Sequence, residues 1–290
     1  MNPIKKTMKT IKLILLAVFA SLAAGAQNDI DGIAVCHTSP TEKFALFASN
    51  KDFNKAHADP LPYVHISEVG KMITFKTADG KDGSGYLLMA KKKTNNWIFV
   101  FQEWWGLNDH IKREAEQLYN DLGNVNVIAL DMYDGKVTAS PEEAGKLMGE
   151  FKQDRGTVIV KGAIAYVGKQ AKIGTVGWCF GGGQSMQAAL TAEKQAAACV
   201  IYYGMPETDV NRLKNLNCDV LNIWPTQDKW INGDVTTKFE AAMKAAGKKV
   251  TTKSYDADHA FANPSNPKHN QQFTADAYKH TVEFFKARLK

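Results

Sequence analysis

The segment GWCFGGG, residues 177–183, is the strongest candidate for chemistry in this 290-residue chain. It places a cysteine in the pattern Gly-x-Cys-x-Gly, between the apolar run Ile173–Val176 and a stretch that we expect to be helical from Gly182. A nucleophile on such a strained strand–turn–helix needs flanking glycines, because side chains there would clash with neighbouring backbone. The helix N-terminus also favours a thiolate. The motif predicts a nucleophile elbow carrying Cys179. A phosphate-binding loop is disfavoured, since it would need glycine at position 179.

An acid and a base should follow the nucleophile along the chain, in that order. Asp228 comes after the apolar run Val220–Trp224, and His259 follows the run Val250–Tyr255. Neutral imidazole can take a thiol proton near pH 7, and a buried aspartate fixes its tautomer. We therefore expect Asp228 as the acid and His259 as the base. Asp234 is the fallback acid, although it looks more like a helix N-cap; His269 and His280 are expected at the surface.

Glu103 lies just after the apolar run Trp97–Phe101, at a position where a strand should end. Apolar surroundings raise the pKa of a carboxyl group, so Glu103 is a further acid/base candidate. The backbone N–H groups of Trp104 and Phe180 are the expected oxyanion donors, since they lie on the loop after that strand and directly after the nucleophile. Site chemistry is therefore predicted at the ends of several strands.

These positions require alternating strands and helices. We expect strands at 72–77, 85–90, 97–101, 125–130, 172–177, 197–203, 220–224 and 250–255. We expect helices at 108–122, 141–151, 157–168, 182–194, 234–246 and 273–289. Such alternation with apolar strands predicts an α/β fold with a mainly parallel central sheet and helices on both faces. The first two strands flank a Gly- and Asp-rich turn and should form an antiparallel hairpin at one edge.

Taken together, these motifs resemble the dienelactone hydrolase family of α/β-hydrolases. The matching segments are QEWWGLN (102–108), LDMY (130–133), GWCFGG (177–182), Asp228 and HAF (259–261), in order across about residues 70–290. The resemblance implies a Cys179–His259–Asp228 triad, with Glu103 contacting the resting thiol and helping to deprotonate it. It implies no metal and no organic cofactor.

One position departs from the family pattern in a way that bears on the substrate. Dienelactone-cleaving members carry an arginine for the substrate carboxylate four residues after the histidine, where this chain has Asn263. Arg155 is the other nearby candidate cation. A neutral amide cannot form a charge-assisted bidentate bond. We therefore expect Asn263, Trp105 and Tyr133 to line a pocket that favours neutral esters or lactones. A thioesterase or acyltransferase with the same triad, and a non-catalytic ligand-binding protein, are the alternatives.

The N-terminus has the features of a signal peptide. Four lysines precede the apolar run 13–20, the small residues Ala24-Gly25-Ala26 follow, and the run is too short to span a bilayer. We expect cleavage before Gln27, and hence a periplasmic or secreted protein without a stable membrane anchor. The formal net charge of +6 owes four units to those lysines, so it gives little support to a nucleic-acid partner.

Residues 27–70 are interpreted as an N-terminal extension before a hydrolase domain at 71–290. Its histidines, His37, His57 and His65, match no compact metal-ligand spacing, and we expect them to be solvated loop residues. An exported protein can form disulfides, but the sequence does not choose a pair among Cys36, Cys199 and Cys218. Cys199 and Cys218 lie in or beside strands and are expected to be structural.

Overall fold

The computed structural model describes residues 39–57 and 59–290; the predicted signal peptide, Cys36 and His37 lie outside these ranges. Eight strands form one sheet in the order β1-β2-β4-β3-β5-β6-β7-β8. The strands are β1 (Lys71–Lys76), β2 (Asp82–Leu88), β3 (Asn96–Phe101), β4 (Asn126–Leu130), β5 (Lys172–Trp178), β6 (Ala196–Tyr202), β7 (Asp219–Pro225) and β8 (Val250–Tyr255). β1 pairs antiparallel with β2, and β2 pairs antiparallel with β4. The neighbours in the remaining series β4-β3-β5-β6-β7-β8 all pair in parallel. The predicted edge hairpin and parallel sheet are thus confirmed.

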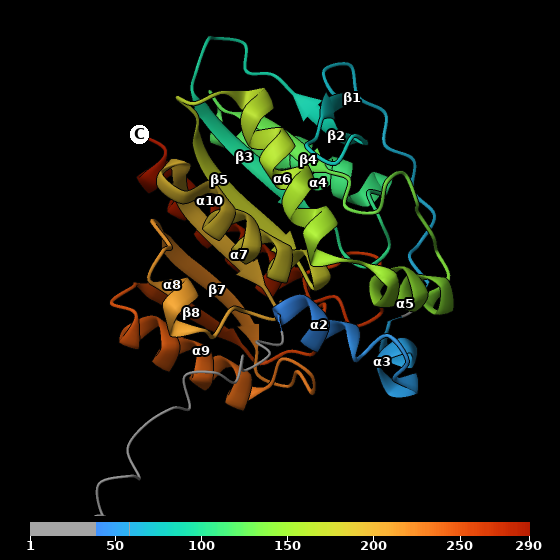
Figure 1. Ribbon diagram of the computed structural model, residues 1–290. Helices are drawn as coiled ribbons and strands as arrows, with labels where there is room; N and C mark the ends of the chain where they lie inside the picture. Colours follow the sequence, from blue (N-terminus) through green and yellow to red (C-terminus); the bar gives the residue numbers. More distant parts are fainter. Residues whose placement is uncertain (1–38, 58) are drawn as a thin grey trace, which may run out of the picture. The chain divides into compact units, whose positions relative to one another are not determined.

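Helices cover both faces of this sheet, as expected. They are α4 (Asp109–Leu122), α5 (Pro141–Glu150), α6 (Gln153–Val167), α7 (Phe180–Ala192), α8 (Val210–Leu213), α9 (Gly233–Ala245) and α10 (Gln271–Arg288). Helices α6 and α7 lie in front of the sheet in Figure 1, and α4 and α10 lie behind it. The parallel strands direct their carboxyl ends to one edge of the sheet, and the loops that carry the candidate site residues leave from that edge.

Several details of the helices differ from expectation. Helix α6 begins at Gln153, four residues before the expected start at Thr157. Helix α7 begins at Phe180 rather than Gly182, because tertiary packing overrides the poor helix propensity of the glycines. The four-residue helix α8 was not expected from the sequence. Helix α9 is capped by Asn232, whose side chain accepts from the N–H groups of Asp234 and Val235, so the expectation that Asp234 is the N-cap is wrong. Asp234 is exposed.

The described part of the 27–70 segment contains two short helices, α2 (Pro40–Ala45) and α3 (Lys51–Ala56). Ser39 and Glu42 form a capping box at the start of α2, and Asn50 caps α3. Phe44 and Phe53 from these helices are buried in the same apolar core as the strands. Neither helix was expected from the sequence. Each helix has only six residues, too few to show a helical period of apolar residues in the sequence. Packing against the rest of the fold stabilises both helices.

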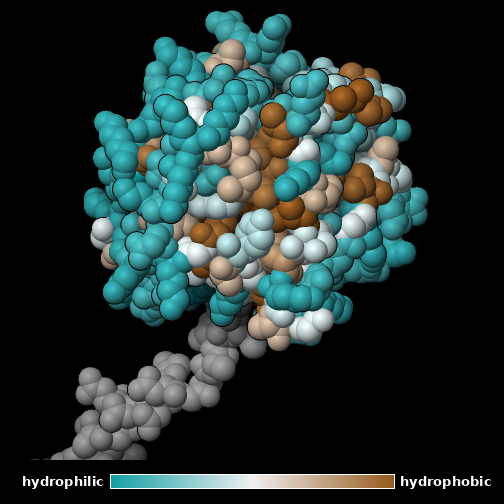
Figure 2. Space-filling view, turned by 90° about the horizontal axis from the view of Figure 1, so that it is seen from above, coloured by the Kyte–Doolittle hydropathy of each residue, from teal (hydrophilic) through white to brown (hydrophobic). Residues whose placement is uncertain are grey.

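Polar side chains cover most of the face seen in Figure 2, where apolar residues gather along a central band. Strands β3 and β4 are almost entirely buried, as a sheet covered on both faces requires. Among the described residues, no helix has both the length and the apolar character needed to cross a membrane.

Candidate active site

Cys179 sits on the sharp turn between β5 and α7, with backbone angles φ 57° and ψ −118°. A Cβ at Gly177 would lie 2.1 Å from the carbonyl oxygen of Gly181, and a Cβ at Gly181 would lie 2.3 Å from that of Gln102. Neither backbone atom can move away cheaply, so glycine is required at both positions. The local sequence thus holds Cys179 in a strained conformation at the end of a central strand.

Two backbone amides are directed at the Cys179 sulfur. The N–H groups of Phe180 and Trp104 hydrogen-bond the sulfur and lower the pKa of the thiol. Burial and the nearby Glu103 act in the opposite direction and prevail, so the pKa of Cys179 lies well above its usual value. The resting group is therefore a neutral thiol that already faces two donors. The same donors could stabilise an oxyanion formed beside the sulfur.

Asp228 and His259 form a buried pair on the loops after β7 and β8. The Nδ1–H of His259 donates to Oδ2 of Asp228 at 2.5 Å, and both side chains are almost fully buried. The other carboxylate oxygen of Asp228 accepts from the backbone N–H groups of Trp230 and Ile231, each at 2.9 Å. The aspartate is thereby fixed, and it fixes the imidazole in turn. Nε2 of His259 has no hydrogen-bond partner among the described residues, and a ring nitrogen of His259 lies within 4.8 Å of the Cys179 sulfur.

Glu103 is buried after β3 and bonded to Asn263. The side-chain amide of Asn263 donates to Oε2 of Glu103 at 2.6 Å, while its oxygen accepts from Ser265. Burial, with a smaller contribution from Glu114, raises the pKa of Glu103, and the Asn263 hydrogen bond lowers it; the net pKa is about 8. The carboxyl group is consequently poised to exchange a proton near neutral pH. Asn263 thus contacts the acid/base candidate directly, a contact that the sequence did not suggest.

His57 is not a solvated loop residue. It caps the C-terminus of α3 and is buried, and its Nδ1 lies 2.7 Å from the carbonyl oxygen of Phe53. Its ring centroid lies 5.2 Å from that of His259 and 4.7 Å from that of Trp104. Burial, with His259 nearby, lowers its pKa to about 3. The expectation for His57 is therefore wrong, and no spacing signal in the sequence could have joined it to this centre.

His65 also differs from the expectation of a solvated residue. Its Nε2 pairs with Glu116 at 2.8 Å, and its side chain is mostly buried. This pair involves helix α4 and is separate from the Cys179 centre.

Aromatic rings cover the Asp228–His259 pair. Phe53 is fully buried, and its ring centroid lies 5.2 Å from Trp104, 5.0 Å from Trp230 and 6.0 Å from His259. Cys179 and His259 are themselves only 1% and 4% exposed. Helix α3 therefore closes the centre from the side of the extension. Trp105 is buried against Trp104, with ring centroids 4.9 Å apart.

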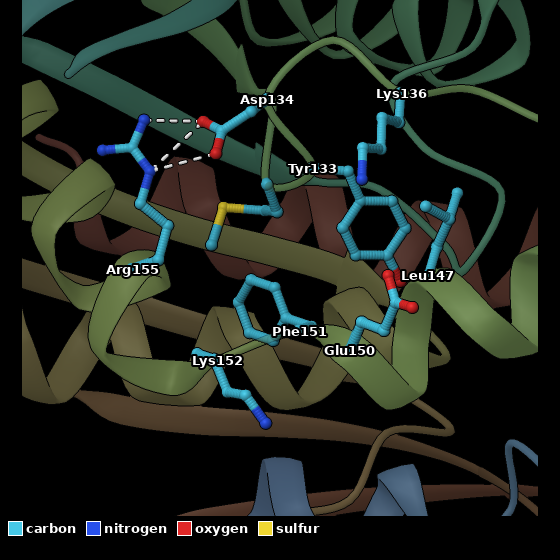
Figure 3. A pocket seen from close by; sticks show the side chains of 9 residues that line it. Tyr133, Asp134, Lys136, Leu147, Glu150, Phe151, Lys152 and Arg155 are labelled. Carbon is cyan, nitrogen blue, oxygen red and sulfur yellow. Dashed lines mark hydrogen bonds and ion pairs between the residues drawn. The ribbon is translucent and has the colours of Figure 1, made fainter.

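A cavity of about 230 Å³ lies next to the centre and is lined by Tyr133, Phe151 and Arg155, among others (Figure 3). The Tyr133 ring lies 5.2 Å from that of Phe180, which follows the candidate nucleophile. Arg155 is paired with Asp134 and Asp79, so its charge is already balanced. Of the expected pocket residues, Tyr133 borders this cavity, whereas Trp105 and Asn263 do not.

The other two cysteines in the described part of the chain lie away from this centre as free thiols. Cys199 is buried in β6 beside Ser185, and burial raises its pKa to about 11. Cys218 is partly buried just before β7. Both positions fit the expected structural role.

A mainly parallel sheet, a strained Gly-x-Cys-x-Gly turn after a central strand and an Asp–His pair on later loops define the protein as an α/β-hydrolase. Comparison with known proteins identifies the family within the α/β-hydrolases. The profile of the dienelactone hydrolase family matches residues 84–289, and the chain belongs to this family. It is accordingly a hydrolase acting on ester or lactone bonds.

Individual relatives are distant but span the same domain. A protein of Aquifex aeolicus named "Putative carboxymethylenebutenolidase" is 26% identical over 77% of this chain and all of its own length. "Protein usf" of Aquifex pyrophilus is 28% identical over 76% of this chain and all of its own length. The crystal structure of a dienelactone hydrolase-like promiscuous phosphotriesterase from metagenomic libraries superposes with a TM-score of 0.66. It is 18% identical and covers 77% of this chain and 100% of its own. That likeness shows the shared fold.

Proposed function

We propose that this protein cleaves a carboxylic ester or lactone through a cysteinyl acyl-enzyme. Cys179 is the nucleophile, His259 the general base and then the general acid, and Asp228 the residue that orients the imidazole. The observation that carries the proposal is the buried Asp228–His259 pair, in which a ring nitrogen of the histidine lies within 4.8 Å of the Cys179 sulfur. Catalytic contacts of this length tighten when substrate binds.

The first half of the reaction forms the acyl-enzyme. The thiol proton passes to His259, which becomes an imidazolium, and the thiolate attacks the carbonyl carbon. The N–H groups of Trp104 and Phe180, which already face the sulfur, stabilise the resulting oxyanion. The C–O bond then breaks, and the imidazolium of His259 gives its proton to the leaving oxygen. In a lactone, that oxygen stays attached to the acyl chain.

The second half is hydrolysis of the thioester. His259 removes a proton from water, the hydroxide attacks the acyl carbon, and the thiolate leaves and regains a proton. Glu103 is a second proton acceptor for the thiol only in the minor fraction of molecules in which it is ionised near pH 7, because its pKa is about 8. Since the thiol is neutral at rest, deprotonation must accompany substrate binding.

We expect a preference for neutral substrates, because the two positions predicted to bind a substrate carboxylate offer no free cation; the lysines of the cavity, Lys136 and Lys152, share it with Asp134 and Glu150. Asn263 is engaged with Glu103, and Arg155 is engaged with two aspartates, so neither offers a free charge to a substrate carboxylate. Tyr133 and Phe151 line the neighbouring cavity, their rings pack against that of Phe180, and this aromatic wall suits an apolar acyl group.

We also propose that the protein is exported and that the mature chain begins at Gln27. The proposal rests on the lysine-rich start, the short apolar run and the Ala-Gly-Ala sequence that follows it.

Hydrolysis of a p-nitrophenyl acyl ester tests the mechanism. Cys179→Ala should abolish turnover and prevent accumulation of an acylated protein in rapid-quench mass spectrometry, while the circular dichroism spectrum stays unchanged. Cys199→Ala removes a buried thiol outside the centre and serves as the control; it should retain acylation. His259→Ala should lose nearly as much activity as Cys179→Ala, because the two act as a unit. Near wild-type turnover by Cys179→Ala would show that the nucleophile is a different group.

A further inference from the structure

Two buried imidazole rings, not one, face the Cys179 sulfur. His259 belongs to the hydrolase core, whereas His57 is brought in by the short helix α3. One ring nitrogen of His57, one ring nitrogen of His259 and the sulfur of Cys179 lie within 4.8 Å of one another, and all three residues are buried. The mechanism above uses His259 and Cys179 and leaves His57 without a role.

Both histidines are held in the same tautomer. Nδ1 of His259 is bonded to the carboxylate of Asp228, and Nδ1 of His57 to the carbonyl oxygen of Phe53. An oxygen acceptor at Nδ1 places the proton there and leaves Nε2 as a lone pair. Neither Nε2 has a hydrogen-bond partner among the described residues. Two buried acceptors thus converge on a single thiol, which has one proton to share between them.

We propose that His57, Cys179 and His259 form a binding site for Zn²⁺. Two imidazole nitrogens and one thiolate are a set that zinc accepts, and three protein ligands leave its fourth position open. Bonds of roughly 2.0 to 2.3 Å would draw the three atoms closer together than they are in the free centre. The proposal goes beyond the hydrolase function, which needs no metal, and its inhibitory consequence rests on that function.

The surroundings match those of metal-ligating histidines. Such histidines donate their second ring nitrogen to a carboxylate or a backbone carbonyl, and here Asp228 and Phe53 provide one of each. The rings of Phe53 and Trp104 pack against His57 and exclude water. Thiolate and imidazole ligands favour Zn²⁺ over Mg²⁺ and Ca²⁺, which prefer oxygen.

Metal binding would stop hydrolysis reversibly. The Cys179 S–H bond breaks, its proton leaves to solvent, and a sulfur–zinc bond forms, with no change of oxidation state. The nucleophile and the base are then both occupied. The centre would hydrolyse esters as a free thiol and would be inactive with metal bound, and a chelator would restore hydrolysis.

Cobalt(II) and zinc chloride are suitable probes for the mature chain after treatment with a chelator and desalting. Cobalt should bind with one-to-one stoichiometry and produce the near-ultraviolet absorption of thiolate-to-cobalt charge transfer. Zinc should displace it and should inhibit ester hydrolysis, whereas Mg²⁺ at the same concentration should do neither. These absorption readouts do not depend on turnover.

The decisive variant is His57→Gln, with His65→Gln as the control. His65 lies in the same extension but is paired with Glu116, outside the centre. His57→Gln should weaken cobalt binding and zinc inhibition at least tenfold, each measured relative to the metal-free activity of the same variant. His65→Gln should match the wild type. His57→Asn provides a second substitution if the first unfolds, as judged by thermal melting.

Three results would overturn the proposal: no charge-transfer band in the wild type, unchanged zinc inhibition in a folded His57 variant, or equal inhibition by Mg²⁺. Failure of the proposed function looks different, because the wild type would then bind cobalt through its thiolate yet hydrolyse no ester.

Discussion

Replacing Glu103 with glutamine should remove a large part of the pH dependence of stability. Glu103 is buried, and burial, with a contribution from Glu114, raises its pKa from 4.5 to about 8. Between these values the unfolded chain loses a proton that the folded protein keeps. Rising pH therefore favours unfolding. The stabilisation is complete below the unfolded pKa and is lost as the pH rises through the folded pKa.

The magnitude follows from the two pKa values. A rise from 4.5 to about 8 corresponds to about 5 kcal/mol once the pH exceeds both values. Between pH 5 and pH 9 the expected loss in the free energy of unfolding is about 4 kcal/mol. Glutamine has a similar shape but does not titrate, so this loss should disappear in Glu103→Gln.

Urea unfolding at several pH values between 5 and 9 measures the effect. The Cys179→Ala background is preferable, because it removes the buried thiol whose pKa is also raised. Glu283→Gln, on the exposed side of α10, controls for the loss of one carboxylate from the surface. Parallel stability curves for the parent and Glu103→Gln would refute the reasoning, and would place the Glu103 carboxylate in contact with water or with a cation in solution.

Four further outcomes are expected. Asp228→Asn should lower kcat for ester hydrolysis by about 10³- to 10⁴-fold, because the amide no longer holds Nδ1–H toward it; a loss below tenfold would contradict the orienting role. Phe53→Ala should lower the free energy of unfolding by about 3 to 5 kcal/mol and speed alkylation of Cys179 by iodoacetamide; an unchanged rate would show that α3 does not close the centre. The wild type should show a higher kcat/KM for a neutral lactone than for its carboxylate-bearing counterpart, and a tenfold preference for the anionic one would refute the assignment. Intact-mass analysis of protein from the native host should give a chain beginning at or near Gln27, and retention of the first twelve residues would contradict export.

Much of the fold follows from the sequence by local rules. Each strand of the sheet was expected within three residues at each end, because apolar runs bounded by Gly, Asp and Asn signal buried strands. The start of α4 also follows locally, since the Asn108 side chain accepts from the N–H of Ile111. The short helix α8 has too few residues to leave a periodic signal. Tertiary contacts set its presence instead.

The sharp turn at Cys179 can likewise be predicted from the sequence. Gly177 leaves room for the backbone of Gly181, only four residues further along the chain. Gly181 leaves room for the backbone at the end of the neighbouring strand β3. Chain order then suggests Asp228 and His259, and the structure places their side chains 2.5 Å apart. The proximity of these side chains can be inferred from the sequence because each lies on a short segment at a known place in a parallel sheet, whereas their catalytic roles stay predictions.

The environment of the centre depends on contacts between distant segments. The pKa of Glu103 is set by its burial and by Asn263, which lies 160 positions away in the chain. His57 reaches the thiol because α3 packs Phe53 against Trp104 and Trp230, and no spacing rule relates these positions. Sequence alone thus determined the fold and the order of the candidate residues. Only the tertiary structure decided that α3 covers the Cys179 centre, that the pKa of Glu103 is raised and that His57 lies beside His259. Burial and ring packing are properties of the assembled chain.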